Sequence, residues 1–554
     1  MNAAAVRHLS FYPYVQPLAR DTVRFILEAA AGDLLACDLI WWRRAEPDKR
    51  GCVPMTPGRN DGCRQHWRAE VAFAEETHYI KYAFQLTDRE GRRRWFNAYG
   101  PQDMAGESGC FELLQINQTD VPRAPEWASG CIYYQIFPER YDRAGEPTQK
   151  TEPWNAAPTR ENYLGGDLRG ILGRLDYLSG LGVECIYLNP VFEGDYNHKY
   201  ATTDYFRIDP IFGTEADLRE LAERAHARGI RMILDGVFNH VGIHFPPFQD
   251  LLENGEASRY RDWFYPKRYP IGIDAACYEC VGDYPYMPRL NGANPEVRAY
   301  VERVLLYWLE RAHIDGWRFD VADELDRHAV TGWREAVKRI YPDALMLGET
   351  WGDASRLLGP DGFDSAMNYL FRDAVADFFA RGAIDAQGLE KRLNGMLMRY
   401  PEETNHIMYN LIGSHDTARF LTEAGGEKWR VRLAMAFQML FPGSPAIYYG
   451  DEIGMEGGND PGCRGGMAWE RQDAELLTWE KRMIALRKKH PALRRGSYAV
   501  LTAKGSIFAF QRELGGDRVA SFFNTGDTPE TVDFTDAGEP VHIPPRSVKI
   551  IDSY

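Results

Sequence analysis

Four short segments combine a carboxylate with the end of an apolar run, and three of them add a histidine or an arginine. They are residues 235–240 (DGVFNH), 316–320 (GWRFD), 347–349 (LGE) and 414–416 (SHD). A carboxylate beside a cation tends to stay ionised, whereas one among apolar groups tends to keep its proton. Two carboxylates that differ in this way are what cleavage of a glycosidic bond requires. The pattern therefore indicates a site for cleaving sugars.

The elements that must position these segments alternate between short apolar strands and amphipathic helices. Helix ends are well marked, for example by a capping box at Thr214 and Asp217 and a stop at Gly229. Eight strand–helix units with right-handed connections predict an α/β fold, a (β/α)8 barrel. The predicted strands are 131–137, 184–188, 230–238, 314–320, 344–349, 365–369, 408–413 and 446–450.

Composition and spacing divide the 554 residues into three expected domains. Residues 1–122 show short alternating runs and turn signals, which predict an N-terminal β-sandwich. Residues 123–493 form the barrel, and a long insertion at about 241–292 predicts an excursion domain over its mouth. Residues 494–554 return to short strands, which predict a C-terminal β domain.

The acidic residues fall where predicted strands end. Asp235 follows the third strand, Asp320 the fourth, Glu349 the fifth and Asp416 the seventh. Any one of them alone could be a helix cap or a solvated loop acid, but four in register with four strand ends favour catalysis, because barrel enzymes work at this edge. With these motifs the chain resembles the α-amylase family, glycoside hydrolase family 13, over residues 130 to 470.

The resemblance implies that Asp320 is the nucleophile, Glu349 the general acid/base, and Asp416 the group that fixes hydroxyls of the distorted sugar. Arg318 lies on the same strand face as Asp320, so we expect it to keep that carboxylate ionised. Glu349 follows four residues without charge, so we expect it to hold its proton. The two carboxyl groups should lie about 5–5.5 Å apart, as in enzymes that retain the anomeric configuration.

The resemblance also implies a set of residues that contact substrate. His240 and His415 are similar to a pair that binds the sugar at the cleavage point, and Tyr200 to a tyrosine that stacks on it. Asp460 and Arg464 would hold the next sugar on the non-reducing side. The further expected contacts are His198, Arg318 and Trp351.

Two features are similar to the group of neopullulanases, cyclomaltodextrinases and maltogenic amylases. Residues 287–291 (MPRLN) resemble that group's MPKLN signature, and residues 450–464 resemble its loop after strand eight. The sandwich is similar to an extra module that, in this group, packs across the partner's active site. The resemblance thus implies a neutral α-glucan substrate, cyclic or short, and a homodimer formed through the N-terminal domain.

The chain departs from the family pattern in two places. The stretch 144–150 (AGEPTQK) stands where relatives carry a calcium loop, and Gly165 and Asp167 alone supply too few oxygens for a hard cation. We therefore expect no metal and no cofactor, with Lys150 supplying the lost charge. Asp323 stands where relatives usually have asparagine, which adds negative charge on the acceptor side.

Charge and composition exclude other classes. A net charge of −15 argues against nucleic acid or an anionic membrane as a partner. The chain has no apolar run of eighteen residues and no apolar leader, and its nine scattered cysteines suit a reducing compartment, so we expect a cytoplasmic protein. Cys277 and Cys280 have the spacing of half a zinc site but lack a second pair.

Three alternatives remain open at this point. A relative that mainly transfers glycosyl groups would use the same residues. An α-1,6-glucosidase is disfavoured by residues 287–291 and by the N-terminal module. A non-catalytic glucan-binding barrel is disfavoured because both central carboxylates, Asp320 and Glu349, are present.

Overall fold

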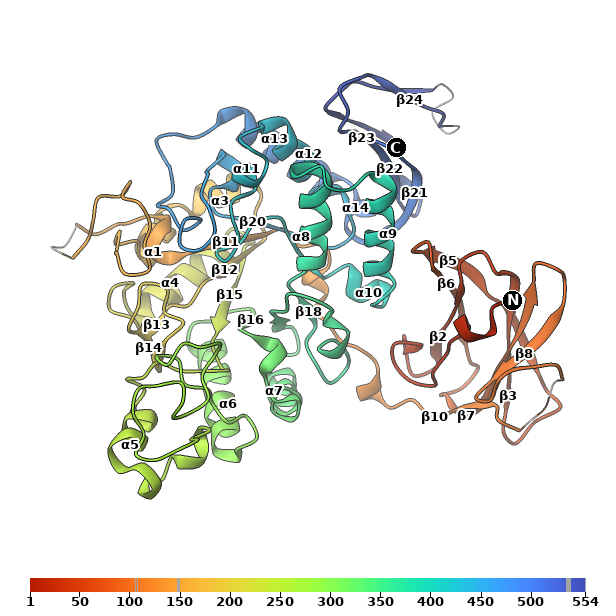
Figure 1. Cartoon of the computed structure of the whole chain (residues 1–554), viewed down its shortest axis with the longest axis horizontal. Coiled ribbons are helices and arrows are strands. Elements are labelled where there is room, and N and C mark those ends of the chain that lie inside the picture. The colour runs from red at the N-terminus through yellow and green to blue at the C-terminus, as the bar shows by residue number, and fades with distance from the viewer. Residues whose placement is uncertain (105, 107, 147–149, 535–539, 554) are drawn as a thin grey trace. The chain divides into compact units, whose positions relative to one another are not determined.

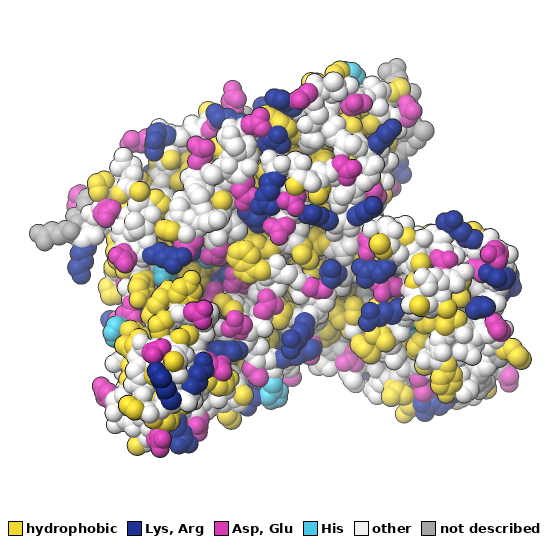
Figure 2. Space-filling view, in the orientation of Figure 1, with side chains coloured by type: hydrophobic (Ala, Val, Ile, Leu, Met, Phe, Trp, Pro, Cys, Tyr) yellow, Lys and Arg dark blue, Asp and Glu magenta, His cyan; other side chains and the backbone are white. Residues whose placement is uncertain are grey.

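The computed structural model describes residues 1–553 apart from 105, 107, 147–149 and 535–539. The chain divides into two compact units, one made of residues 1–123 and 387–405 and the other of the remainder. No helix among the described residues is long and apolar enough to cross a membrane. Acidic and basic side chains alternate over the visible face without a large patch of one sign (Figure 2).

The first unit is built on two antiparallel sheets that enclose an apolar core, as the alternating runs predict. The core includes Phe25, Leu39, Trp67 and Phe84. One sheet has the order β1 (Val15–Pro17), β2 (Thr22–Ala30), β6 (Arg64–Ala72) and β5 (Thr56–Asn60). The other has the order β4 (Gly51–Pro54), β3 (Leu34–Arg43), β7 (His78–Asp88), β8 (Arg93–Asn97) and β9 (Gly100–Gln102), with β10 (Phe111–Gln115) paired to β7.

Two helices from the middle of the chain belong to this same unit, which the sequence pattern did not indicate. They are α9 (Ala386–Leu397), nearly all of it, and α10 (Glu402–Asn405). Arg24 donates two hydrogen bonds of 2.9 Å to the carboxylate of Glu403, and Asn394 donates one of 2.9 Å to the carbonyl of Asn60. A bidentate arginine–carboxylate pair fixes orientation as well as distance.

The second unit contains a parallel sheet of eight strands (Figure 1), and each predicted strand is present. A bridge between Met367 and Tyr409 joins the two end strands and closes the barrel. In sheet order the strands are β18 (Ser365–Ala366), β17 (Leu345–Gly348), β16 (Gly316–Phe319), β15 (Arg231–Gly236), β12 (Cys185–Leu188), β11 (Tyr133–Ile136), β20 (Ser444–Tyr448) and β19 (Tyr409–Leu411).

The join between β18 and β19 depends on side chains because the strands there are short. Ser365 donates to the carbonyl of Ile407 at 2.6 Å, and Asn368 donates to the side-chain oxygen of Asn410 at 2.8 Å. These buried side-chain hydrogen bonds take the place of backbone hydrogen bonds between β18 and β19.

Register within the barrel brings the functional side chains to one height. Asp235 pairs directly with Arg318 across β15 and β16, and Arg318 pairs with Leu347 on β17. Below this level the barrel is filled by buried side chains such as Tyr133, Ile233 and Leu345. An apolar filling of this kind leaves only the carboxyl-end edge open for chemistry.

Helices cover the outside of the barrel and confirm the predicted caps. They are α2 (Leu168–Gly173), α3 (Leu175–Leu181), α4 (Glu215–His226), α6 (Pro295–Arg311), α7 (Arg327–Ile340), α8 (Tyr369–Val375), α12 (Lys428–Leu440) and α13 (Ala474–Lys489). Thr214 and Asp217 form the capping box of α4, and Asn294 caps α6. The insertion after β15 contains α5 (Pro246–Asn254) and the bridges Pro266–Tyr278 and Cys280–Pro288.

The chain ends in β strands, as predicted. A four-stranded antiparallel sheet has the order β21 (Ser497–Lys504), β22 (Ile507–Leu514), β23 (Asp517–Asn524) and β26 (Ser547–Ser553). A short pair, β24 (Glu530–Val532) and β25 (Val541–Ile543), lies beside it. Its core includes Phe522 and Ile543.

A buried acidic pair supports the loop that follows β20. Glu452 accepts hydrogen bonds of 2.7 Å from the hydroxyls of Tyr134 and Tyr177, and one of 2.8 Å from the amide of Gly450. Glu480 on α13 is also buried, and its Oε2 has no hydrogen-bond partner among the described residues. Burial, with Glu452 and Asp451 adding to it, raises the pKa of Glu480 to about 8.

This raised pKa predicts a loss of stability on the alkaline side. Between pH 4.5 and about 8 the folded protein keeps a proton on Glu480 that the unfolded chain releases, so the free energy of unfolding falls as pH rises through this window. Glu480→Gln should remove that dependence and raise the stability relative to wild type at pH 8 by about 4 kcal/mol, with little gain at pH 4.5. Thermal melts at both values measure this. Glu475→Gln, on the exposed side of α13, is the control, and an equal effect of Glu480→Gln at both pH values would contradict the prediction.

Candidate active site

A pocket of about 370 Å³ opens at the carboxyl ends of the barrel strands. It contains every predicted site residue except Arg318, which lies buried beneath it. The predicted residues that line the pocket are His198, Tyr200, His240, Asp320, Glu349, Trp351, His415, Asp416, Asp460 and Arg464. Predicted residues from six separate segments of the chain thus meet in one cavity.

The guanidinium of Arg318 joins the acidic groups of three neighbouring strands. Its Nη1 lies 2.8 Å from Asp235 Oδ1 and 2.8 Å from Asp320 Oδ1, and its Nη2 lies 2.8 Å from Glu349 Oε2. All four side chains are nearly fully buried. The predicted contact with Asp320 is present, but Arg318 does not select the nucleophile, because it contacts Glu349 equally closely.

Arg318 lowers the pKa of Asp320, as expected, but burial outweighs this effect, so the net shift is opposite to the one that the sequence predicted. Burial raises the pKa of Asp320 well above its usual value, Glu349 and Asp235 add to the rise, and Arg318 only opposes it. Burial also raises the pKa of Asp235, although Tyr187 and Tyr200 donate to it at 2.6 and 2.8 Å. Because Asp235 and Asp320 contact the same guanidinium, their titrations are linked and their pKa values shift together.

The position of Glu349 depends on an unusual backbone conformation at Val321. This residue has φ +45°, which a β-branched side chain rarely adopts and which costs about 1–3 kcal/mol. The conformation directs the amide of Val321 to Glu349 Oε2 at 2.8 Å. The amide of Ala322 bonds to the Glu349 carbonyl at 3.1 Å. The strained turn therefore holds the glutamate from its backbone and its side chain.

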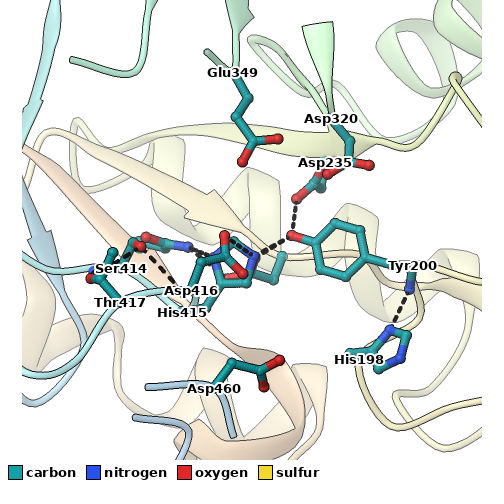
Figure 3. A network of polar contacts seen from close by, with 12 residues as sticks. His198, Tyr200, Asp235, Asp320, Glu349, Ser414, His415, Asp416, Thr417 and Asp460 are labelled. Atoms are coloured by element: carbon teal, nitrogen blue, oxygen red, sulfur yellow. Dashed lines mark hydrogen bonds and ion pairs between the residues drawn. The ribbon is translucent and has the colours of Figure 1, made fainter. Parts of the chain in front are cut away.

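The floor of the pocket is a stack of Tyr200 on His415, with ring centroids 5.5 Å apart and planes 6° from parallel. Gln135 donates to His415 Nδ1 at 2.8 Å, so the ring proton must lie on Nε2. That nitrogen is 2.7 Å from the Tyr200 hydroxyl and 3.1 Å from Asp416 Oδ2 (Figure 3). Burial lowers the pKa of His415 well below its usual value, so the ring is neutral.

The other two histidines of the pocket are neutral for the same reason. Burial lowers the pKa of His198 and of His240 to about 3. His198 Nδ1 accepts a bond of 3.0 Å from the amide of Tyr200. His240 Nε2 lies 3.8 Å from Asp320 Oδ2, which is too far for a hydrogen bond and leaves room for a sugar hydroxyl to approach both groups.

A row of alternating charges runs away from Asp416. Arg464 Nη2 lies 3.1 Å from Asp416 Oδ1, and Arg464 Nη1 lies 2.9 Å from Asp460 Oδ1. Arg160 Nη2 then contacts Asp460 Oδ2 at 3.0 Å. Burial, with Glu349 adding to it, raises the pKa of Asp416 to about 7.

The opposite side of the pocket carries Trp351 and Asp323. Trp351 stacks on Tyr369 with centroids 4.1 Å apart and is 53% exposed, so its free face is available to a ligand. Asp323 lines the pocket and bonds to the Thr350 side chain and the Trp351 backbone. Burial raises its pKa, and Glu349 adds to the rise.

Sequence reasoning missed several pocket residues. Arg160, Val281, Tyr284 and Tyr286 line the cavity but belong to no strand-end motif. The two tyrosines immediately precede the 287–291 signature, and an aromatic pair there could have been noticed. Arg160 has no signal, because its role depends on a contact with residue 460, far along the chain.

Comparison with known proteins gives the same assignment. Residues 135–475 match the alpha amylase catalytic domain and residues 1–117 the alpha amylase N-terminal ig-like domain. The cyclomaltodextrinase of Thermoanaerobacter pseudethanolicus is 40% identical, over 96% of this chain and 94% of its own length. Neopullulanase 2 of Thermoactinomyces vulgaris is 39% identical, over 96% and 92%. A solved cyclomaltodextrinase structure superposes with a TM-score of 0.91 at 38% identity, over 96% and 93%.

A barrel with paired carboxylates at its open edge, shared with such relatives, defines a glycoside hydrolase. The chain belongs to the alpha-amylase family.

Proposed function

We propose that the enzyme cleaves α-1,4-glucosidic bonds in short and cyclic α-glucans, namely cyclodextrins, maltooligosaccharides and pullulan, through a covalent glycosyl–enzyme. The names of its relatives, cyclomaltodextrinase and neopullulanase, support the substrate class. One observation carries the mechanism: a single guanidinium holds Asp320 and Glu349 side by side at the pocket. A pair held by one guanidinium fits the separation of about 5–5.5 Å expected for a retaining enzyme.

In the proposed reaction Asp320 attacks the anomeric carbon while Glu349 gives its proton to the leaving oxygen. This reaction requires Asp320 to be ionised and Glu349 to carry a proton. Positive charge that develops at the anomeric carbon favours this arrangement, because it stabilises an ionised Asp320. After the aglycone leaves, Glu349 takes a proton from water, and the resulting hydroxide releases the sugar from Asp320.

The surrounding groups orient the sugar in this proposal. Neutral His240 donates to a hydroxyl, and neutral His415 holds Tyr200 in place, without adding positive charge beside the anomeric carbon. Asp416, opposite Glu349 across the pocket, accepts from two hydroxyls of the same ring (Figure 3). Tyr200 stacks on its apolar face.

Initial rates on β-cyclodextrin, pullulan and soluble starch test the proposal. We expect the cyclic and short-repeat substrates to be hydrolysed faster than starch, and the first product to be the α-anomer. Asp320→Asn, nearly the same size as the aspartate, should reduce the rate about 10⁴-fold or more while leaving the melting temperature close to wild type. Starch as the preferred substrate would contradict the substrate class, and a β-anomer or an active Asp320→Asn would contradict the mechanism.

We also propose that no calcium binds at residues 144–150, although the prediction falls partly on 147–149, which lie outside the described residues. The carboxylate of Asp167 already accepts from the amides of Gly170 at 2.6 Å, Ala144 at 3.2 Å and Gly145 at 3.3 Å. Amide hydrogens that point at these oxygens repel a cation. The described residues of this loop therefore do not fit calcium.

Chelation checks this proposal directly. Activity in excess EDTA should stay within about 20% of the untreated enzyme, because a hard cation needs six or more oxygens that this loop does not offer. Strong inactivation, reversed by added calcium, would refute it.

We further propose a homodimer formed through the N-terminal sandwich. Tyr79 and Leu114 are exposed neighbours on β7 and β10, and such apolar side chains favour a protein partner. Light scattering should give twice the 63.3 kDa mass of the chain, and the mass of one chain at micromolar concentration would count against it. Buried thiols at Cys131, just before β11, and at Cys185 on β12 support a cytoplasmic location, which cell fractionation checks.

A further inference from the structure

We propose that Arg160, Tyr284 and Tyr286 form an additional glucosyl-binding subsite beyond Asp460, on the non-reducing side of the pocket. The inference rests on the proposed function, which sets the direction of the chain, and it assigns residues that no strand-end motif contains. The three side chains line the same cavity as the central carboxylates. Two rows of side chains lead to them from the cleavage point.

The first row is the alternating chain of charges. It passes from Asp416 through Arg464 and Asp460 to Arg160, with successive contacts of 3.1, 2.9 and 3.0 Å. Arg464 is almost fully buried, whereas the side chain of Arg160 is 51% exposed. The row therefore ends on a guanidinium with donors free to face solvent or a sugar hydroxyl, since one carboxylate oxygen cannot engage all five N–H groups.

The second row is aromatic. The ring of Tyr196 stacks on that of His198, with the two planes 4° from parallel. The ring centroids of Tyr286 and Tyr196 are 4.8 Å apart, and those of Tyr284 and Tyr286 are 5.7 Å apart. Tyr284 is 44% exposed, at the outer end of the row. Tyrosine rings present an apolar face and a polar edge, which suits the C–H face and hydroxyls of a glucosyl ring.

The two rows meet at the pocket mouth. Arg160 and Asp460 from the charged row line the same cavity as Tyr284 and Tyr286 from the aromatic row. The glucosyl unit that follows the one bound by Asp460 and Arg464 would therefore contact the two tyrosines and the guanidinium of Arg160.

The turn that carries Arg160 and the segment that carries the two tyrosines are both held by hydrogen bonds within the protein. The turn that carries Arg160 is closed by Asn162, which exchanges bonds of 2.9 and 3.0 Å with Thr159, and Asn197 donates to the carbonyls of both residues. Between the tyrosines, the Pro285 carbonyl accepts from the buried hydroxyl of Tyr278. Preorganisation of this kind lowers the entropic cost of binding.

The cleavage pattern of reducing-end-labelled maltopentaose tests the subsite. Cleavage that places three glucosyl units on the non-reducing side yields unlabelled maltotriose, and cleavage that places two there yields unlabelled maltose. Arg160→Gln and Tyr286→Ala should each lower the ratio of the first mode to the second about fivefold to tenfold, the effect of losing one stacked ring or one charged hydrogen bond. The rate on maltotriose, which is too short to reach the subsite, should stay within about twofold of wild type.

Control variants separate binding from structural effects. Arg169→Gln removes an exposed arginine that pairs with an aspartate outside the pocket and should change nothing. Tyr284→Ala removes a half-exposed ring that does not contact Asp460, so a lower ratio in this variant cannot come from a displaced Asp460. Tyr286→Phe should retain most of the wild-type ratio.

Three results would contradict the proposed subsite. An unchanged ratio in Arg160→Gln and in both alanine variants, a ratio that rises, or a wild-type enzyme that never uses the three-unit mode would do so while leaving the proposed function intact. A wild-type enzyme that cleaves no α-glucan would instead refute the proposed function, and the subsite with it.

Discussion

The buried guanidinium of Arg318 is the interaction on which the site depends. A charge taken out of water is costly unless it is paired and hydrogen-bonded, and here one cation satisfies carboxylates from three adjacent strands. The pairing works only because the register places Asp235 beside Arg318 and the next two strands end at the same level. The same strand register therefore fixes both the geometry of the barrel and the pairing of charges in the site.

The histidines follow from the same balance of charge. A pocket with several carboxyl groups could have been neutralised by imidazolium ions, but burial keeps His198, His240 and His415 uncharged. The negative potential around Asp320 is thus preserved for a substrate that becomes cationic at the transition state. The same rings still supply directed hydrogen bonds, because Gln135 fixes the tautomer of His415.

Much of this was accessible from the sequence because it is local. Periodicity and turn signals predicted all eight barrel strands, the capping box located the start of α4, and strand ends located Asp320, Glu349 and Asp416. What the sequence could not show depends on distant contacts. The association of residues 387–405 with the sandwich rests on Arg24 and Glu403, and Arg160 acquires a role only beside Asp460. The pKa of Asp320 was misjudged because a neighbouring arginine is visible in the sequence, whereas the extent of desolvation is not.

The closure of the barrel has a consequence for how the site adapts. Glu349 follows β17 and Asp416 follows β19, and between those strands lies β18, only two residues long and bridged to β19 at a single point. The cylinder consequently has a seam, spanned by a few side-chain bonds such as that between Tyr369 and Ser414 at 3.3 Å. Local opening begins where backbone bonding is sparsest. This seam lies between Glu349 and Asp416, whereas the strands that carry the charged centre, β15, β16 and β17, are each paired over four residues. The least strongly bonded part of the cylinder therefore separates the catalytic pair from the residue that would orient the sugar.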